Sequence, residues 1–367
     1  MTDAGDRVQA LLEEFVATGP EIGLQVAAYL EGELVVDAWA GLADEASGRP
    51  VGPDTLFTVF SVSKGVTATC VHLLAERGQI DYEDPVAAHW PEFAANGKEG
   101  VTIRHVLTHS AGLPTTPSDL DTDTMIDWER MCAEVAAAGL QWEPGTRSGY
   151  HGSTYGWILG EVLRRVDGRR IEDFLQEEIC RPLRIDSLFF GVPAAEEHRV
   201  AMLATGPLPP PELRTPWFEK AVAQTPDFNR SDVRRAALPA HGGIMNARSL
   251  ARHYALLERG GNLDGVRILS PERIRIATEV QYEGPDAQVG FPVRRGLGYG
   301  LGGVGFGPVC DRPDAFGHGG LGGAEGFVDP GRRIAFALVK DYLDVAPDEN
   351  STTAVVYRAV LEALGLA

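Results

Sequence analysis

The chain has 367 residues, 44% of them hydrophobic, and carries a formal net charge of −19. This composition can supply one large domain or two lobes, while the acidic balance argues against nucleic-acid or anionic-membrane partners. Four widely spaced cysteines without C-x-x-C spacing indicate neither a disulfide framework nor a zinc site. The first residues lack the basic start and apolar core of a signal peptide, and no apolar run is long enough to cross a membrane, so we expect a cytoplasmic protein.

The beginning of the chain combines helical and strand-like patterns. Residues 6–16 have the apolar spacing of an amphipathic helix, and residues 24–29 and 34–40 predict the two strands of a hairpin. Helical spacing returns at residues 66–77, and Gly78 stands where that helix would end.

Helical patterns dominate the middle of the chain, separated by loops that carry proline and glycine. They cover residues 102–107, 125–138, 154–166, 171–179 and 249–260. Further on, residues 324–329 and 334–341 predict two strands around a turn, and residues 351–364 predict a closing helix.

These patterns favour an α+β fold in which strands from both ends of the chain form one antiparallel sheet flanked by helices. We expect a single domain over residues 1–367, with an α/β lobe from residues 1–60 and 285–367 and a mainly helical lobe from residues 61–284. A cleft would separate the two lobes. The proline-rich stretch 206–235 predicts a long loop, which fits either a lid over the cleft or a packed surface excursion.

Ser61 and Lys64 form the pair of residues in this sequence that most clearly indicates chemistry. Ser61 stands where the helix over residues 66–77 would begin, and a spacing of three places its hydroxyl and the Lys64 amine on one side of the helix. Free N–H groups and the positive end of the helix dipole would lie nearby, which suits an oxygen that acquires negative charge. The structural alternative is that Ser61 is a helix N-cap and Lys64 a surface lysine.

Two loops complete the set of candidate functional segments. A turn-rich loop presents Tyr150 just before a helix that Ser153 or Thr154 could cap. Residues 316–323 contain five glycines next to a predicted strand, which lets another chain or a substrate approach the backbone closely. Taken alone, the tyrosine can also be a packed aromatic residue, and the glycine run can also be a bulged turn.

In this order and spacing, Ser61-x-x-Lys64, the Pro-Gly loop with Tyr150, and His318-Gly319-Gly320 resemble the serine β-lactamase and penicillin-binding-protein superfamily. The match is closest to class C-like β-lactamases and family VIII carboxylesterases. Residues 101–114 and 241–245 are similar to further signatures of the family. The resemblance extends over nearly the whole chain and implies a β-lactamase/transpeptidase-like fold.

The resemblance also implies roles for individual residues. Ser61 would be the acylated nucleophile, and Lys64 and Tyr150 would share proton transfer, with either of them as the general base. The backbone N–H groups of Ser61 and Leu321 would form the oxyanion hole. No cofactor or metal is needed, and the other histidines, His109 and His241 among them, would be structural.

The substrate-binding positions depart from the penicillin-recognising pattern. We assign substrate binding to His318, Gly319, Gly320, Gly152 and His151. Members that recognise penicillin usually have Asn at the position of Gly152 and Lys at the position of His318. Without an amide clamp and a permanent positive charge, β-lactams and D-alanyl peptides should bind weakly, and a carboxylic ester without a free carboxylate fits better.

The sequence therefore predicts a serine carboxylesterase that forms an acyl-enzyme at Ser61 with a small-molecule ester. An acyltransferase or transesterase could use the same acyl-enzyme, and a β-lactamase or D-peptidase is a further alternative. A non-catalytic binding module would form no acyl-enzyme at all. No nucleic acid or membrane is expected as a partner, and a homo-oligomer is compatible with the sequence.

Overall fold

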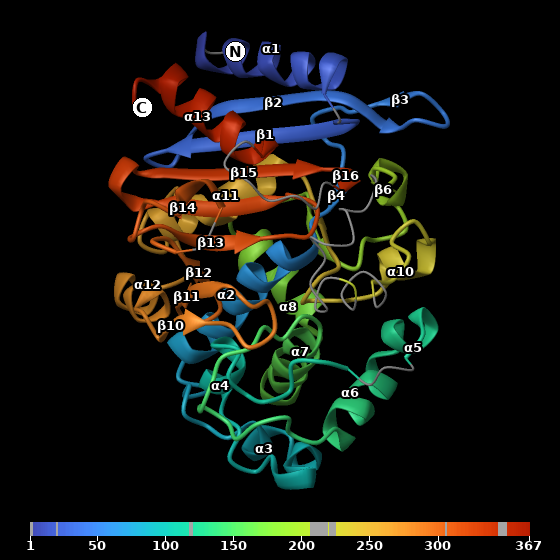
Figure 1. Ribbon diagram of the computed structural model, residues 1–367, viewed down its shortest axis with the longest axis vertical. Coiled ribbons are helices and arrows are strands. Elements are labelled where there is room, and N and C mark those ends of the chain that lie inside the picture. The colour runs from blue at the N-terminus through green and yellow to red at the C-terminus, as the bar shows by residue number, and fades with distance from the viewer. Residues whose placement is uncertain are drawn as a thin grey trace.

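The computed structural model describes residues 3–19, 21–116, 120–205, 219, 225–304, 307–343 and 351–367. Within these ranges, one antiparallel sheet of nine strands runs from the top of the molecule in Figure 1, at β2 and β3, down to its middle, at β10 and β11. In spatial order its strands are β10 (Tyr282–Pro285), β11 (Pro292–Arg295), β12 (Gly300–Leu301), β13 (Phe316–Gly319), β14 (Glu325–Asp329), β15 (Ile334–Lys340), β1 (Gly23–Leu30), β2 (Glu33–Asp44) and β3 (Arg49–Pro50).

Strand β1 joins the two ends of the chain. Its residues are almost all buried, so it is apolar on both faces and belongs in the centre of the sheet. It pairs with β15 from Leu24 opposite Lys340 to Leu30 opposite Ile334, and with β2 on its other side. The β1–β2 turn has φ values of 53° at Glu31 and 86° at Gly32, as a tight two-residue hairpin requires. The predicted hairpin and the predicted strands after residue 320 are confirmed.

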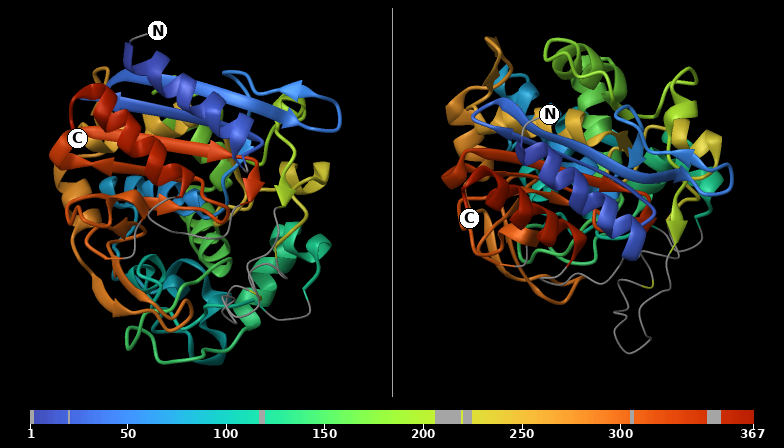
Figure 2. Two further views of the ribbon diagram at one scale, coloured as in Figure 1. Left: turned by 45° about the horizontal axis from the view of Figure 1, so that its top comes forward. Right: turned by 90° about the horizontal axis from the view of Figure 1, so that it is seen from above.

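Helices cover both faces of this sheet. α1 (Asp3–Thr18) and α13 (Thr352–Leu364) lie together over one face, where they share a core with β1, β2, β14 and β15 (Figure 2). Tyr357 of α13 packs edge-on against Phe327, with ring centres 5.0 Å apart. α11 (Ala247–Glu258) packs on the other face, against β1, β14 and β15. The helix that the sequence places among the insertion helices therefore directly supports the sheet.

Among the remaining helices, α2 (Ser63–Glu76) is buried from Ser63 to Ala75. A helix that is buried all round lies in a core rather than on a surface. The others are α3 (Val86–His89), α4 (Ile103–Leu107), α5 (Thr122–Ile126), α6 (Trp128–Ala137), α7 (Thr154–Asp167), α8 (Ile171–Leu175), α10 (Ser231–Arg235) and α12 (Pro271–Thr278). Three small sheets pair β4 (Phe57–Thr58) and β5 (Leu188–Phe190) with β7 (Gly243–Met245), β6 (Ala204–Thr205) with β16 (Tyr342–Leu343), and β8 (Asn262–Leu263) with β9 (Val266–Arg267).

Two predicted helices differ from the observed ones in how they end. The helix predicted over 125–138 is divided at Asp127, whose extended backbone ends α5 and whose side chain accepts the N–H of Arg130 to cap α6. The helix predicted over 171–179 ends at Leu175 and continues as a π-helical turn over Gln176–Cys180. Hydrophobic periodicity continues through both interruptions, so it does not reveal them.

Most of the proline-rich stretch 206–235 lies outside the described residues. Its last part, from residue 225, is described and ends in α10, so the choice between a lid and a surface excursion stays a prediction. None of the helices in the described ranges is long and apolar enough to span a membrane.

Candidate functional site

Ser61 lies in a single 3-10 turn, Phe60–Val62, directly before α2. The sequence predicts that Ser61 opens the helix, and the structure places it one turn earlier. Phe60 has φ of 49°, an unfavourable left-handed conformation for a bulky residue. Such strain is found at sites that hold a side chain in a fixed position, here the half-buried Ser61 hydroxyl next to it.

The motif at residues 241–245 anchors this turn. Its last three residues form β7, which pairs with β4 just before the turn, and the N–H of Val59 donates to the carbonyl of Gly243 at 2.9 Å. The Ser63 hydroxyl in turn accepts the N–H of Gly243 at 2.8 Å. A Cβ atom at residue 243 would lie 2.6 Å from that hydroxyl, so glycine is required for the approach.

Lys64 is fully buried beside the serine, on the first turn of α2. Its Nζ donates to Ser61 Oγ at 3.1 Å and to the carbonyl of Ala240 at 2.8 Å. Within the described ranges no acidic side chain forms an ion pair with it, and burial holds the pKa of its ammonium well below the usual range. This environment favours the neutral amine, which can accept a proton. The surface-lysine interpretation is therefore wrong.

Tyr150 reaches the same place from a loop that the motif at residues 101–114 supports. The carbonyl and ring of His109 accept the N–H groups of Gly149 and His151, at 2.9 and 3.0 Å. The ring centres of His109 and Tyr150 are 4.8 Å apart. Thr154 fixes the start of the following helix by donating its hydroxyl to the carbonyl of Leu113 at 2.6 Å. The loop is thus held by backbone and side-chain contacts on the side away from Ser61.

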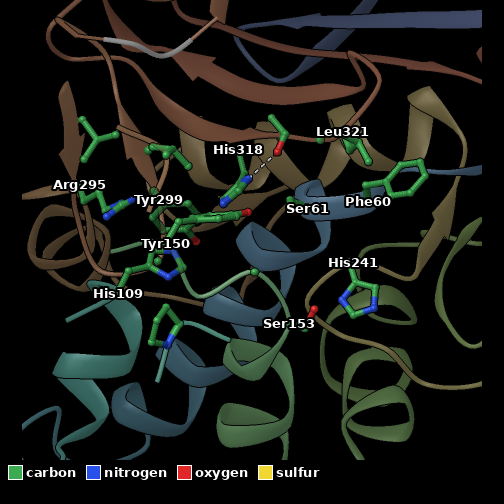
Figure 3. A pocket seen from close by; sticks show the side chains of 18 of the residues that line it. Phe60, Ser61, His109, Tyr150, Ser153, His241, Arg295, Tyr299, His318 and Leu321 are labelled. Atoms are coloured by element: carbon green, nitrogen blue, oxygen red, sulfur yellow. Dashed lines mark hydrogen bonds between the residues drawn. The ribbon is translucent and has the colours of Figure 1, made fainter. Parts of the chain in front are cut away.

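The Tyr150 hydroxyl faces Ser61 (Figure 3). Lys64 Nζ lies 4.9 Å from the centre of the tyrosine ring. Burial raises the pKa of the Tyr150 hydroxyl, and a hydrogen bond with Ser61 and the charge of Arg295 act in the opposite direction. The phenol is therefore protonated at neutral pH. The structure thus brings together Ser61, Lys64 and Tyr150, which the sequence places on two separate segments.

Leu321 lies across from Ser61 in a tight turn after β13. The N–H of Gly320 donates to the carbonyl of Ala324 at 2.7 Å and closes this turn. A Cβ atom at residue 320 would lie 2.3 Å from the carbonyl oxygen of Val59, so the glycine lets the end of β13 touch the serine turn. In a 3-10 turn the first N–H groups lack an acceptor within the turn, and Ser61 holds one of these positions. Both N–H groups assigned to an oxyanion hole thus lie on neighbouring backbone turns.

These residues line a cavity of about 370 Å³, which is large enough for a small organic ligand. Its wall includes Ser61, Tyr150, Gly152, His318, Gly319, Gly320 and Leu321. One side is apolar, with Val289, Phe291 and Val293. His318 is half-buried, its Nδ1 is 2.7 Å from the carbonyl oxygen of Gly319, and burial lowers its pKa to about 3, so the imidazole is neutral.

The structure does not bring His151 to the cavity, although the resemblance assigned this residue to substrate binding. His151 is fully buried behind the loop. Its Nε2 accepts the N–H of Leu113 at 3.0 Å, and its Nδ1 lies 2.7 Å from the carbonyl oxygen of Gly149. Both ring nitrogens therefore hold the loop that presents Tyr150 in place.

Sequence reasoning missed several residues of the cavity. Arg295, Glu325, His109 and His241 line it, and Asp286 lies directly behind Arg295. Burial raises the pKa of the Glu325 carboxyl to about 8 and lowers that of the His241 imidazole to about 3. The sequence offered a signal for the two histidines, which stand in the motifs at 101–114 and 241–245, but none for the other residues.

The described part of the chain contains no cluster of three His, Cys, Asp or Glu side chains that could hold a metal ion. The polar groups that converge on Ser61 are a lysine, a tyrosine and neutral histidines. This arrangement can activate a hydroxyl through a neutral amine, stabilise an oxyanion with backbone N–H groups, and deliver a proton from a phenol.

Comparisons with known proteins agree with this geometry. A family model described as Beta-lactamase matches residues 8–359. The esterase/beta-lactamase LipL of Mycobacterium tuberculosis is 37% identical over 349 residues, which cover 88% of this chain and 77% of that protein. A solved family VIII carboxylesterase aligns with a TM-score of 0.88 at 33% identity, and a penicillin-binding protein homologue from Caulobacter crescentus with 0.87 at 34%. Both alignments cover 99% of this chain and 98% of the other.

The matched family model covers nearly the whole chain, so the chain belongs to the β-lactamase family. Its fold is the β-lactamase/transpeptidase-like fold that the motifs predicted, with mixed helices and an antiparallel sheet. The similarity to esterase and β-lactamase relatives identifies it as a serine hydrolase of this fold.

Proposed function

We propose that this protein is a carboxylesterase that hydrolyses small esters through an acyl-enzyme at Ser61. The observation that carries the proposal is the 3.1 Å contact between the Ser61 hydroxyl and the amine of a buried lysine that has no acidic partner in the described structure. The esterase names of relatives and of a solved neighbour support the same activity. The apolar wall of the cavity suits an acyl chain.

The two proton-carrying residues take different roles in this proposal. Lys64 is the general base, because burial favours its neutral amine, whereas burial keeps the Tyr150 phenol protonated. Ser61 Oγ attacks the ester carbonyl carbon as its proton passes to Lys64 Nζ, and the N–H groups of Ser61 and Leu321 bind the developing oxyanion. The proposal therefore assigns the role of base, which the sequence left open between Lys64 and Tyr150, to Lys64.

Collapse of the tetrahedral intermediate completes acylation. The bond between the carbonyl carbon and the alcohol oxygen breaks, and that oxygen takes the bonding electron pair together with the Tyr150 phenolic proton. Tyr150 recovers a proton from the Lys64 ammonium, which held the one taken from Ser61. Water then attacks the acyl-enzyme by the same steps in reverse order and releases the acid.

Covalent labelling tests this proposal. An alkyl phosphonate probe should attach to Ser61, as peptide mass spectrometry would detect, and Ser61→Ala should lose both labelling and hydrolysis of p-nitrophenyl butyrate. Ser63→Ala is not a suitable control because Ser63 holds the serine turn, whereas Ser47→Ala, in the exposed β2–β3 connection, should remain active. Labelling at another residue, or a fully active Ser61→Ala, would refute the proposal.

A further inference from the structure

A buried ion pair lies behind the tyrosine of the site. Arg295 in β11 and Asp286 just after β10 are 7% and 2% exposed, and Arg295 Nη2 lies 2.5 Å from Asp286 Oδ2. Both residues contact Tyr150. Asp286 Oδ1 accepts the Tyr150 N–H at 3.2 Å, and the Arg295 guanidinium carbon lies 5.8 Å from the centre of the tyrosine ring.

Other hydrogen bonds fix the pair in this position. Arg295 Nη1 donates to the hydroxyl of Ser148, which donates to the carbonyl of Thr108 at 3.0 Å. Asp286 Oδ1 also accepts the N–H groups of Gln288 and Val289, at 2.7 and 2.8 Å. These hydrogen bonds therefore fix both side chains next to Tyr150. Because both are buried, water screens their charges little.

The titratable groups that face Tyr150 come from several elements. Lys64 of α2, His109 of the loop after α4 and His318 of β13 surround its ring, together with Arg295 of β11. Burial lowers the pKa of His109 and His318, so both are neutral, and it also favours the neutral form of Lys64. Among the described residues around the ring, the Arg295–Asp286 ion pair thus supplies one charge of each sign.

We propose that Arg295 and Asp286 are positioning residues that set, in opposite directions, how readily Tyr150 gives its proton to the departing alcohol. The inference rests on the proposed function, in which the Tyr150 O–H bond breaks as the ester C–O bond breaks. The positive charge of Arg295 stabilises the phenolate that forms, and the negative charge of Asp286 destabilises it. The ion pair therefore determines which alcohols the enzyme can expel.

Leaving groups of different acidity separate this role from a structural one. Ethoxide is a poor leaving group and must receive a proton as it departs, whereas p-nitrophenolate leaves without one. With butyrate as the shared acyl group, kcat/KM reports acylation for both esters. The ratio of kcat/KM for ethyl butyrate to that for p-nitrophenyl butyrate therefore measures proton donation by Tyr150, and a general loss of active enzyme cancels in it.

The test compares Arg295→Gln, Asp286→Asn and Arg295→Lys with the wild type. Arg295→Gln should lower the ethyl-to-nitrophenyl ratio about 10-fold, and Asp286→Asn, which keeps an oxygen for the Tyr150 N–H, should raise it by a similar factor. Arg295→Lys keeps the charge and should preserve the ratio. The matched control Arg275→Gln, in an exposed pair with Glu272, should also leave it unchanged.

A ratio that stays at the wild-type value in Arg295→Gln, with both esters slowed equally, would overturn the inference. Should Asp286→Asn fail to fold because it leaves Arg295 unpaired, the comparison of Arg295→Gln with Arg295→Lys still decides, since only the first removes charge. This outcome can be told apart from failure of the proposed function. If the proposed function fails, Ser61→Ala remains active. If Ser61 is still labelled but the ester ratio is the same in Arg295→Gln and the wild type, only the role of the ion pair is rejected.

Discussion

The chemistry of the site depends on how burial changes two ordinary side chains. In water at neutral pH a lysine is protonated and cannot accept a proton, whereas a tyrosine is already protonated, because the ordinary pKa values of both groups lie near 10. Burial lowers the pKa of Lys64, which favours the neutral amine, and raises that of Tyr150, which keeps the phenol protonated; in the proposed mechanism these are the base and the acid.

Removing either group should abolish most of the activity without unfolding the protein. Lys64→Ala and Tyr150→Phe are each expected to lower kcat at least about 10²-fold, because each removes one proton-transfer partner. Circular dichroism should show an unchanged fold. Rates close to wild type in folded variants would mean that these residues do not take part in the reaction.

The reaction should depend on pH through Lys64. Only the neutral amine accepts the Ser61 proton, so kcat/KM is expected to rise with pH through the depressed pKa of Lys64 and then to level off. Lys64→Arg, which stays protonated, should be inactive across the range, even at high pH. A kcat/KM profile of the wild type that is flat or falls with rising pH would contradict the assignment of the base.

Selectivity should follow from the residues at positions 152 and 318. Each polar contact that a β-lactam would miss there is worth roughly 1–3 kcal/mol, so p-nitrophenyl butyrate should be turned over with a higher kcat/KM than nitrocefin. Gly152→Asn with His318→Lys should recover part of the activity on nitrocefin, and nothing lies within 4 Å of a Cβ placed at residue 152. Wild-type nitrocefin turnover equal to the ester rate would reject the esterase proposal.

At the scale of elements, the sequence could predict the contacts and strands that depend only on residues close together in the chain. The Ser61 and Lys64 contact follows from a spacing of three on one turn, and the predicted β1–β2 hairpin needed only its own pattern. The contact between Tyr150 and Asp286 joins residues 136 positions apart, and no local pattern marks either partner. The position of the Arg295–Asp286 ion pair beside Tyr150 was therefore missed.

The packing of α6 against α7 depends on a carboxylate that water does not reach. The Glu161 side chain is 0% exposed, and it accepts hydrogen bonds from Arg164, Arg165 and Trp128. Glu161→Ala leaves the Trp128 N–H without its acceptor and leaves Arg164 and Arg165 only the exposed partners Glu129 and Glu92, so it is expected to lower the free energy of unfolding by about 2 kcal/mol in urea titrations. The exposed Glu272→Ala should cause no measurable loss, and equal effects of both variants would contradict this account.

A buried histidine links α2 to the segment before β12. The ring of His72 bonds to Tyr82 Oη at 2.8 Å and to the carbonyl of Leu297 at 3.0 Å, and burial lowers its pKa to about 3. Below about pH 6.5 the His72 imidazole therefore binds a proton in the unfolded chain but stays neutral in the folded protein. The stability that His72 contributes is present at pH 7 and is lost as pH falls.

Urea unfolding at two pH values measures this contribution. Between pH 7 and pH 5 the wild type should lose about 2 kcal/mol more of its unfolding free energy than His72→Gln. The exposed His198→Gln should show the pH dependence of the wild type. If His72→Gln loses stability on acidification just as the wild type does, the ring does not stay neutral in the folded state.

At the scale of the whole molecule, the predicted α+β fold with one sheet from both ends of the chain is confirmed. The strand patterns at the two ends of the chain and the helical patterns between them were enough to predict this fold, because few arrangements bury the apolar faces of such strands together. The spatial order of the nine strands could not be predicted in the same way, since β3 and β12 are two residues long and leave almost no periodic signal.

The central position of β1 in the sheet affects how the protein folds while it is being synthesised on the ribosome. Leu30 pairs with Ile334, so the early hairpin must wait for nearly the entire chain to be translated before its open edge is covered. Until then an apolar strand edge remains available to other nascent chains and calls for protection by chaperones. The turn that carries Ser61 also acquires its neighbour Leu321 late. A partly synthesised polypeptide therefore lacks Leu321 beside Ser61, and we expect hydrolytic activity only after the last strands have joined the sheet.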